Sequence, residues 1–128
     1  MHGRDVGIHQ DDLDAAIRVA RTGWLSTGKE TTKFEDNFKQ FKQSKHALGL
    51  NSCTAALHLA LLSLNLPKNS EVITTDFTFA ATVSTILHAG YRVNLVDCDK
   101  FTGNISVNSL IKAISSKTKA IVIVHFGG

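Results

Sequence analysis

Apolar residues recur along this chain with two different periods, and the change of period divides it into regions. Near the start, Leu13, Ile17 and Ala20 are spaced as on one face of a helix, with acidic residues crowded into its first turn and Arg18 and Arg21 near its end. Acidic side chains favour the positive end of a helix dipole and basic side chains the negative end. The pattern therefore predicts a helix over residues 11–22.

A second helix is predicted to begin at Thr32, because Glu35 follows three residues later with the spacing of a capping box. Phe34, Phe38 and Phe41 then form one apolar stripe along this helix. We interpret the stripe as a face that packs into the core and not as a cofactor-binding face.

Beyond residue 46, short apolar segments alternate with helical ones. The pattern predicts strands at 46–50, 71–75, 92–97 and 119–125, and helices at 53–65, 80–89 and 107–116. Short strands separated by helices imply right-handed crossover units and a parallel sheet. The predicted fold class is α/β.

Composition and charge exclude several classes of partner. The 128 residues carry 14 basic and 11 acidic side chains, and a net charge of +3 spread along the chain does not indicate a nucleic-acid partner. No segment approaches the roughly 18 to 20 apolar residues of a membrane span, and the first twenty residues lack a signal-peptide pattern. We expect a cytoplasmic protein with no nucleic-acid or membrane partner, in which Cys53 and Cys98 are reduced thiols.

The most informative run extends from Ala47 to Leu61, where an apolar segment ends in small hydroxyl residues that open an apolar helix. The first turn of a helix has unpaired backbone N–H groups and about half a positive charge, which suits a phosphate. Ser52 and Thr54 add hydroxyl donors to such a site. The alternative is that Asn51 or Ser52 only caps the helix.

Two other motifs are rejected. Residues 23–30 fit the phosphate-loop pattern up to its last position, where Glu30 replaces the Ser or Thr that binds magnesium, and a charged helix precedes them. Asp97 and Asp99 are spaced as a metal-binding pair, but Phe101 stands where a further oxygen ligand is needed. We expect no metal site, and we interpret these aspartates as turn caps.

Segments 23–28, 71–82, 91–97 and 117–128, in this order and spacing, resemble the DegT/DnrJ/StrS family of sugar aminotransferases. The resemblance implies the large domain of a fold type I aminotransferase that depends on pyridoxal phosphate, with a mainly parallel sheet. It also implies a nucleotide-linked keto-sugar substrate, an amino acid donor, expected to be glutamate, and a homodimer.

The resemblance implies roles for the helix-opening turn and for one aromatic ring. Ser52, Thr54 and Ala55 fall where the family holds the cofactor phosphate, largely through backbone N–H groups. Phe79 falls where the family stacks an aromatic ring on the pyridine ring. The alternative for Phe79 is a core aromatic that begins a helix.

The resemblance also assigns a substrate loop near the N-terminus. Trp24, Ser26 and Gly28 match the family's loop that closes over the nucleotide-sugar. The alternative is a helix-terminating loop with one buried tryptophan. On this basis residues 1–30 form an N-terminal helix and substrate loop, and residues 31–128 form an incomplete cofactor-binding domain.

No lysine of the chain matches the family's Schiff-base lysine, which lies, with the aspartate that pairs with the pyridine nitrogen, beyond the position of Gly128. We therefore expect an N-terminal fragment that is inactive alone and contains no catalytic residue. Two alternatives stay open. One is a dehydratase of the same family, in which histidine replaces the lysine, and the other is a non-catalytic α/β module that binds a phosphorylated ligand.

Overall fold

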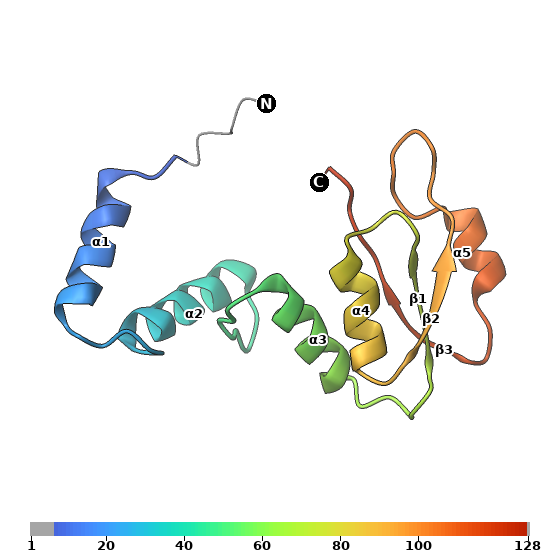
Figure 1. The fold of residues 1–128 in the computed structure, drawn as a ribbon, viewed down its shortest axis with the longest axis horizontal. Coiled ribbons are helices and arrows are strands. Elements are labelled where there is room, and N and C mark those ends of the chain that lie inside the picture. The colour runs from blue at the N-terminus through green and yellow to red at the C-terminus, as the bar shows by residue number, and fades with distance from the viewer. Residues whose placement is uncertain (1–6, 128) are drawn as a thin grey trace. The chain divides into compact units, whose positions relative to one another are not determined.

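The computed structural model describes residues 7–127, and the chain divides into two compact units with the boundary between Gly49 and Leu50 (Figure 1). Residues 1–6 and 128 of the predicted segments 1–30 and 117–128 lie outside the described residues. The division predicted at residue 30, between the substrate loop and the cofactor-binding domain, stays a prediction.

The described part of the first unit, residues 7–49, contains two helices. α1 (Gln10–Arg21) begins after His9, whose backbone N–H donates to the Asp12 carboxylate at 2.9 Å, and ends before Gly23, whose φ is +70°. A positive φ is readily adopted only by glycine, so the chain leaves the helix at this residue. The predicted helix is confirmed.

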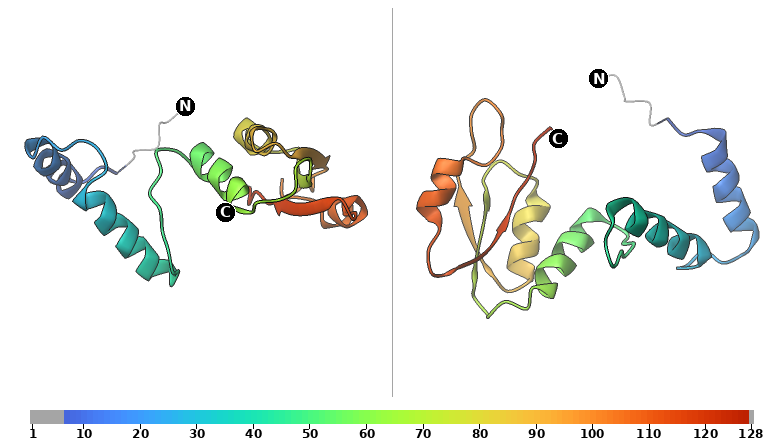
Figure 2. Two further views of the ribbon diagram at one scale, coloured as in Figure 1. Left: turned by 90° about the horizontal axis from the view of Figure 1, so that it is seen from below. Right: turned by 180° about the vertical axis from the view of Figure 1, so that it is seen from behind.

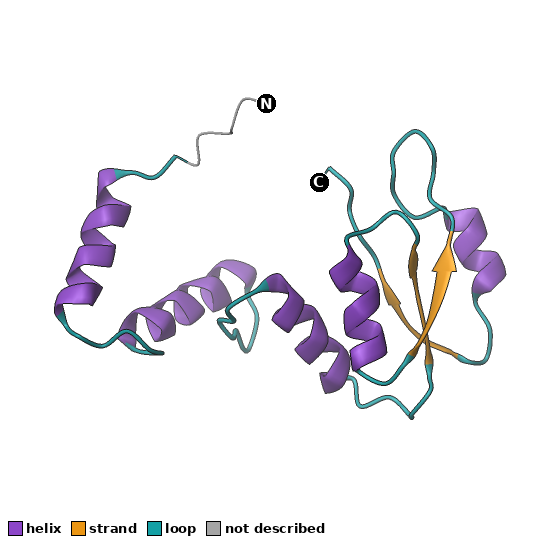
Figure 3. Ribbon diagram, in the orientation of Figure 1, coloured by secondary structure: helices purple, strands orange, loops and turns teal. Residues whose placement is uncertain are grey.

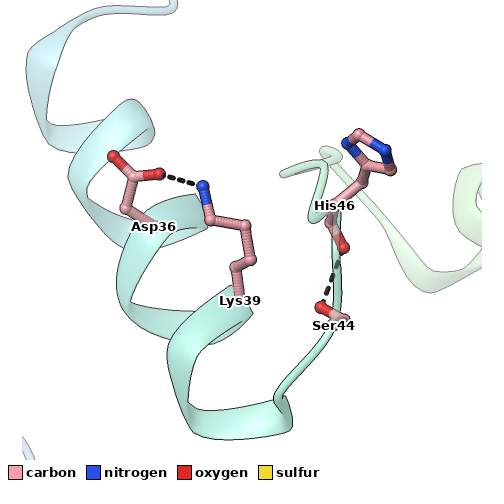
Figure 4. Close-up of polar contacts among 4 residues, drawn as sticks. All are labelled: Asp36, Lys39, Ser44 and His46. Atoms are coloured by element: carbon pink, nitrogen blue, oxygen red, sulfur yellow. Dashed lines mark hydrogen bonds and ion pairs between the residues drawn. The ribbon is translucent and has the colours of Figure 1, made fainter.

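α2 (Lys29–Lys42) begins three residues earlier than expected, with Gly28 in the capping position. The prediction of a capping box formed by Thr32 and Glu35 is wrong, because the Glu35 carboxylate instead accepts the backbone N–H of Gly49 at 2.7 Å. A surface ion pair between Asp36 and Lys39 lies on the same helix (Figure 4). Such exposed pairs stabilise helices by only about 0.3–0.5 kcal/mol.

The phenylalanine stripe of α2 is not core. Phe34, Phe38 and Phe41 are 59%, 45% and 77% exposed, although the rings of Phe34 and Phe38 contact each other with centroids 6.0 Å apart. The helical spacing was correct, but spacing does not determine what a face packs against. After α2, the Ser44 hydroxyl donates to the His46 carbonyl at 2.9 Å as the chain turns back (Figure 4).

The second unit is an α/β structure with three parallel strands in the order β2-β1-β3 (Figure 3). Its elements are α3 (Cys53–Ser63), β1 (Glu71–Thr75), α4 (Ala80–His88), β2 (Arg92–Val96), α5 (Val107–Ala113) and β3 (Thr118–Val122). The predicted fold class and parallel sheet are confirmed.

The predicted strand at 46–50 does not form, because a strand needs a partner and none of the three strands pairs with this segment. Its residue Gly49 donates to Glu35 instead. The last strand and the last helix also end earlier than predicted, at Val122 and Ala113.

The core lies between the sheet and the helices α3 and α4. Leu61, Val72, Ile86 and Tyr91 form one buried cluster. Burying each such apolar side chain contributes about 1.5–3 kcal/mol. The buried Tyr91 hydroxyl has a hydrogen-bond partner, because it donates to the Leu61 carbonyl at 3.3 Å.

Two crossovers connect the strands. The first, through α4, leads from β1 to β2 on one side, and the second, through α5, leads from β2 to β3 on the other side. Right-handed crossovers in opposite directions place their helices on opposite faces of the sheet, as the end-on view shows (Figure 2). The buried residues of β1 are consequently covered on both faces.

Candidate functional site at the carboxyl edge of the sheet

The carboxyl ends of all three strands lie at one edge of the sheet, because the strands are parallel. α3 and α4 run in the opposite direction, so their N-termini lie at the same end of the second unit (Figure 1). Ligands of open α/β sheets bind at this edge. The predicted cofactor residues Ser52, Thr54, Ala55 and Phe79 all occupy these two helix N-termini.

Ser52 caps α3, as its alternative interpretation requires. Its hydroxyl accepts the Ala55 N–H at 3.1 Å. The amide hydrogen that the resemblance assigns to the phosphate is therefore donated to a side chain of the protein in this structure. Ser52 and Ala55 stay predictions as phosphate ligands.

Capping leaves other donors of the same turn available. Among residues 7–127, no acceptor receives the backbone N–H of Cys53 or of Thr54, and the Thr54 hydroxyl has no hydrogen-bond partner. Cys53 and Thr54 are both exposed. Two unpaired amide hydrogens and a hydroxyl at the positive end of a helix form a donor set that fits a phosphate.

Phe79 is the residue before α4, and its side chain is 80% exposed. It is not the core aromatic of the alternative interpretation. The helix it precedes is held by the Thr78 hydroxyl, which donates to the Thr82 hydroxyl at 2.7 Å. An exposed ring at the same end of the second unit as a phosphate-type donor set fits a flat aromatic cofactor such as pyridoxal phosphate.

The predicted substrate loop lies in the first unit and has a defined internal geometry. The Trp24 indole N–H donates to the Thr27 carbonyl at 2.9 Å. A Cβ atom added to Gly28 would lie 2.8 Å from Trp24 Cδ1, so any other residue at this position requires the ring to move. Trp24 is 63% exposed and Ser26 is exposed, which excludes the buried tryptophan of the alternative interpretation.

Asp99 caps a turn, as predicted. Its carboxylate accepts the backbone N–H groups of Phe101 at 3.0 Å and Thr102 at 2.9 Å, and the Thr102 hydroxyl at 3.1 Å. The Thr102 and Phe101 amides, followed by the Thr102 hydroxyl, hold the pKa of Asp99 below its usual value. Asp97 accepts the N–H of the next residue, Cys98, at 2.9 Å.

One cluster of possible metal-ligating side chains is not among the residues predicted from the sequence. Asp76, after β1, lies with Asp97 and Cys98, after β2, so that one ligand atom from each lies within 4.8 Å of the others. The neighbouring strands bring them together, and no local spacing signals it. Both carboxylates are exposed.

The chain was compared with known proteins. The sequence model of the DegT/DnrJ/EryC1/StrS aminotransferase family matches residues 7–128. The spore coat polysaccharide biosynthesis protein SpsC of Bacillus subtilis is 41% identical over 121 residues, which are 94% of this chain and 31% of that protein.

Solved structures of sugar-modifying enzymes are also similar to this chain. The chain is similar to Helicobacter pylori PseC, an aminotransferase involved in the biosynthesis of pseudoaminic acid, with a TM-score of 0.86 and 34% identity over 94% of this chain and 33% of that one. It is also similar to the E. coli GDP-4-keto-6-deoxy-D-mannose-3-dehydratase with bound hydrated PLP, with a TM-score of 0.86 and 27% identity over 91% and 32%. The chain thus spans about a third of the length of these relatives.

Among residues 7–127, no helix combines the length and the apolar character that crossing a bilayer requires.

Proposed function

Because this chain belongs to the DegT/DnrJ/EryC1/StrS aminotransferase family, we propose that it functions in a pyridoxal-phosphate-dependent aminotransferase that acts on a nucleotide-linked keto-sugar, with glutamate as the donor. The relatives in polysaccharide and pseudoaminic acid biosynthesis support the sugar substrate. The homodimer and the cytoplasmic location expected from the sequence belong to this proposal.

The observation that carries the proposal is the donor set at the N-terminus of α3. The unpaired N–H groups of Cys53 and Thr54 and the Thr54 hydroxyl bind the cofactor phosphate in this proposal. The site needs no basic side chain, because the helix dipole favours the dianion. Ser52 orients the turn by capping it.

Phe79 holds the pyridine ring in this proposal by stacking, which adds about 0.5–1.5 kcal/mol beyond burial of the ring. Trp24, Ser26 and Gly28 bind the nucleotide-sugar. When bound, pyridoxal phosphate supplies an electron sink for the amino substrate. The described residues therefore bind and orient, and none of their lysines lies in a motif matching the family's catalytic lysine.

A second candidate function is sugar dehydration with the same cofactor. The similarity to the E. coli dehydratase supports it. Both functions use the same phosphate and ring contacts, so the cofactor site is the feature to test first.

The test measures binding of pyridoxamine 5'-phosphate to the 128-residue chain by calorimetry. This form of the cofactor has no aldehyde and does not react with surface lysines. Pyridoxamine without the phosphate is the matched ligand, and we expect the chain to prefer the phosphorylated form.

Thr54→Pro removes one N–H donor of the site and should abolish most of that preference. Thr54→Ala keeps the N–H and loses one hydroxyl contact, so it should cost about 1–3 kcal/mol of binding free energy. Circular dichroism checks that both variants fold. A folded Thr54→Pro variant with an unchanged preference for the phosphate would refute the assignment.

A further inference from the structure

Three loops meet at one point of the carboxyl edge. Phe77 follows β1, Gly103 and Asn104 follow β2, and Phe126 follows β3; we call these four residues the edge cluster. The rings of Phe77 and Phe126 have centroids 4.8 Å apart and an interplanar angle of 56°. Figure 1 shows the three loops at the same end of the sheet.

Asn104 connects the second loop to the third. Its Oδ1 atom accepts the backbone N–H of Phe126 at 2.9 Å. Asn104 is itself held in place, because its carbonyl accepts the Asp99 N–H at 2.8 Å, and the Asp99 carbonyl accepts the Gly103 N–H at 2.8 Å. The acceptor atom therefore belongs to a hairpin, residues 98–105, that its own backbone hydrogen bonds hold in shape.

The rings of Phe77 and Phe126 pack closely against Gly103. A Cβ atom at this position would lie 2.9 Å from Phe126 Cδ1 and 3.2 Å from Phe77 Cε1. Its φ of +69° also favours glycine. Both rings thus contact the hairpin backbone directly.

The edge cluster includes Phe77, which lies in the same loop between β1 and α4 as Phe79. At one end of this loop the Phe77 N–H donates to the Thr75 hydroxyl at 3.3 Å, and at the other the Thr78 hydroxyl donates to Thr82. Both of these contacts stay within the segment from β1 to α4. The Phe77 ring contacts Phe126 and so joins the segment to the chain after β3, while the Asp76 N–H donates to the Val96 carbonyl at 3.0 Å and joins it to the end of β2.

We propose that Asn104 is a positioning residue for the ring-binding side of the cofactor site: it holds Phe126 against Phe77 and thereby fixes the loop that presents Phe79. This inference rests on the proposed function, since it concerns the same site. Asn104 acts on the orientation of Phe79 and not on the phosphate.

The test compares Asn104→Ala, which removes the acceptor, with Asn104→Asp, which keeps it, using pyridoxamine 5'-phosphate as the probe. Asn104→Ala should weaken binding about threefold to tenfold, the effect of one hydrogen bond. Asn104→Asp should bind within about twofold of the unchanged chain. Phe126→Leu keeps the hydrogen bond but loses the ring contact, and should weaken binding as Asn104→Ala does.

A double-mutant cycle separates positioning from general destabilisation. In a chain that already carries Phe79→Ala, the Asn104→Ala change should have no further effect on binding, because the ring it positions is gone. An equal loss in both backgrounds would overturn the proposal, as would an Asn104→Asp variant that binds as weakly as Asn104→Ala.

The two proposals fail in different ways. If the unchanged chain does not prefer pyridoxamine 5'-phosphate over pyridoxamine, the proposed function fails. The positioning of Phe79 is then read by NMR, as increased side-chain motion of Phe79 and faster exchange of the Phe126 amide in Asn104→Ala. A Phe79 ring equally ordered in both proteins would overturn the inference.

Discussion

The two units of the molecule bury their apolar side chains to very different degrees. Neither helix of the first unit contains a buried residue, although both carry a regular apolar stripe. The second unit encloses Val72 of β1 and Ile86 of α4, which are fully buried between the sheet and the helices α3 and α4. Helices form wherever local pattern and capping favour them, whereas a core requires segments that are far apart in sequence.

The largest expected effect tests this contrast directly. Ile86→Ala should lower the free energy of unfolding by about 2–5 kcal/mol, because it leaves a cavity in the core. Phe38→Ala, on the exposed stripe of α2, should change it by less than about 0.5 kcal/mol. Urea denaturation followed by circular dichroism measures both. Equal losses would show that the α2 stripe is packed in solution.

An intermediate effect is expected from Asp99. Hydrogen bonds to its carboxylate hold its pKa below the unfolded value, so they stabilise the fold at neutral pH. The contribution is complete above the unfolded pKa of about 3.9 and is lost as the pH falls through the lower, folded value. The unchanged chain should therefore lose more stability than Asp99→Asn between pH 6 and pH 3.

The control for Asp99 is Asp11→Asn in the first turn of α1, where the side chain is exposed. It should change the acid-dependent loss of stability less than Asp99→Asn does, in thermal melts recorded over the same range of pH. If Asp99→Asn also leaves it unchanged, the hairpin after β2 does not depend on the charged carboxylate.

The smallest effect on stability is expected from Gly28→Ala. The added methyl displaces the Trp24 indole and breaks its hydrogen bond to Thr27. Trp24 is the single tryptophan, so its emission should shift, while the unfolding free energy falls by at most about 1 kcal/mol because alanine caps a helix less well than glycine. Ser26→Ala, which leaves the indole contact intact, should leave the emission unchanged. An unshifted Gly28→Ala spectrum would show that the loop is not ordered around Trp24.

Local signals predicted the helices and three of the strands. Crossover spacing gave the parallel sheet and the α/β class, and the family resemblance is confirmed by the match over residues 7–128. The failures have one physical origin. The segment 46–50 has the composition of a strand but no partner, and Glu35 binds Gly49, fourteen residues away, instead of completing a capping box.

In the candidate site, too, the local contacts could be predicted from the sequence and the long-range contacts could not. The turn at Ser52 and the cap at Asp99 rest on contacts within three residues, so the sequence indicates them. The contact of Asn104 with Phe126 spans 22 residues and depends on how two strands align, so no local pattern reveals it. The ligand roles of Ser52, Thr54, Ala55 and Phe79 stay predictions.

The strand order also has a consequence for synthesis on the ribosome. β1 is translated before the other two strands, yet it lies between them. Among the three described strands, each later one can join a free side of β1 as it emerges, so none of the three has to be inserted between two that are already paired. The chain can therefore assemble vectorially, with β2 and α4 docking on β1 while β3 is still being made, and the order of translation becomes the order of folding.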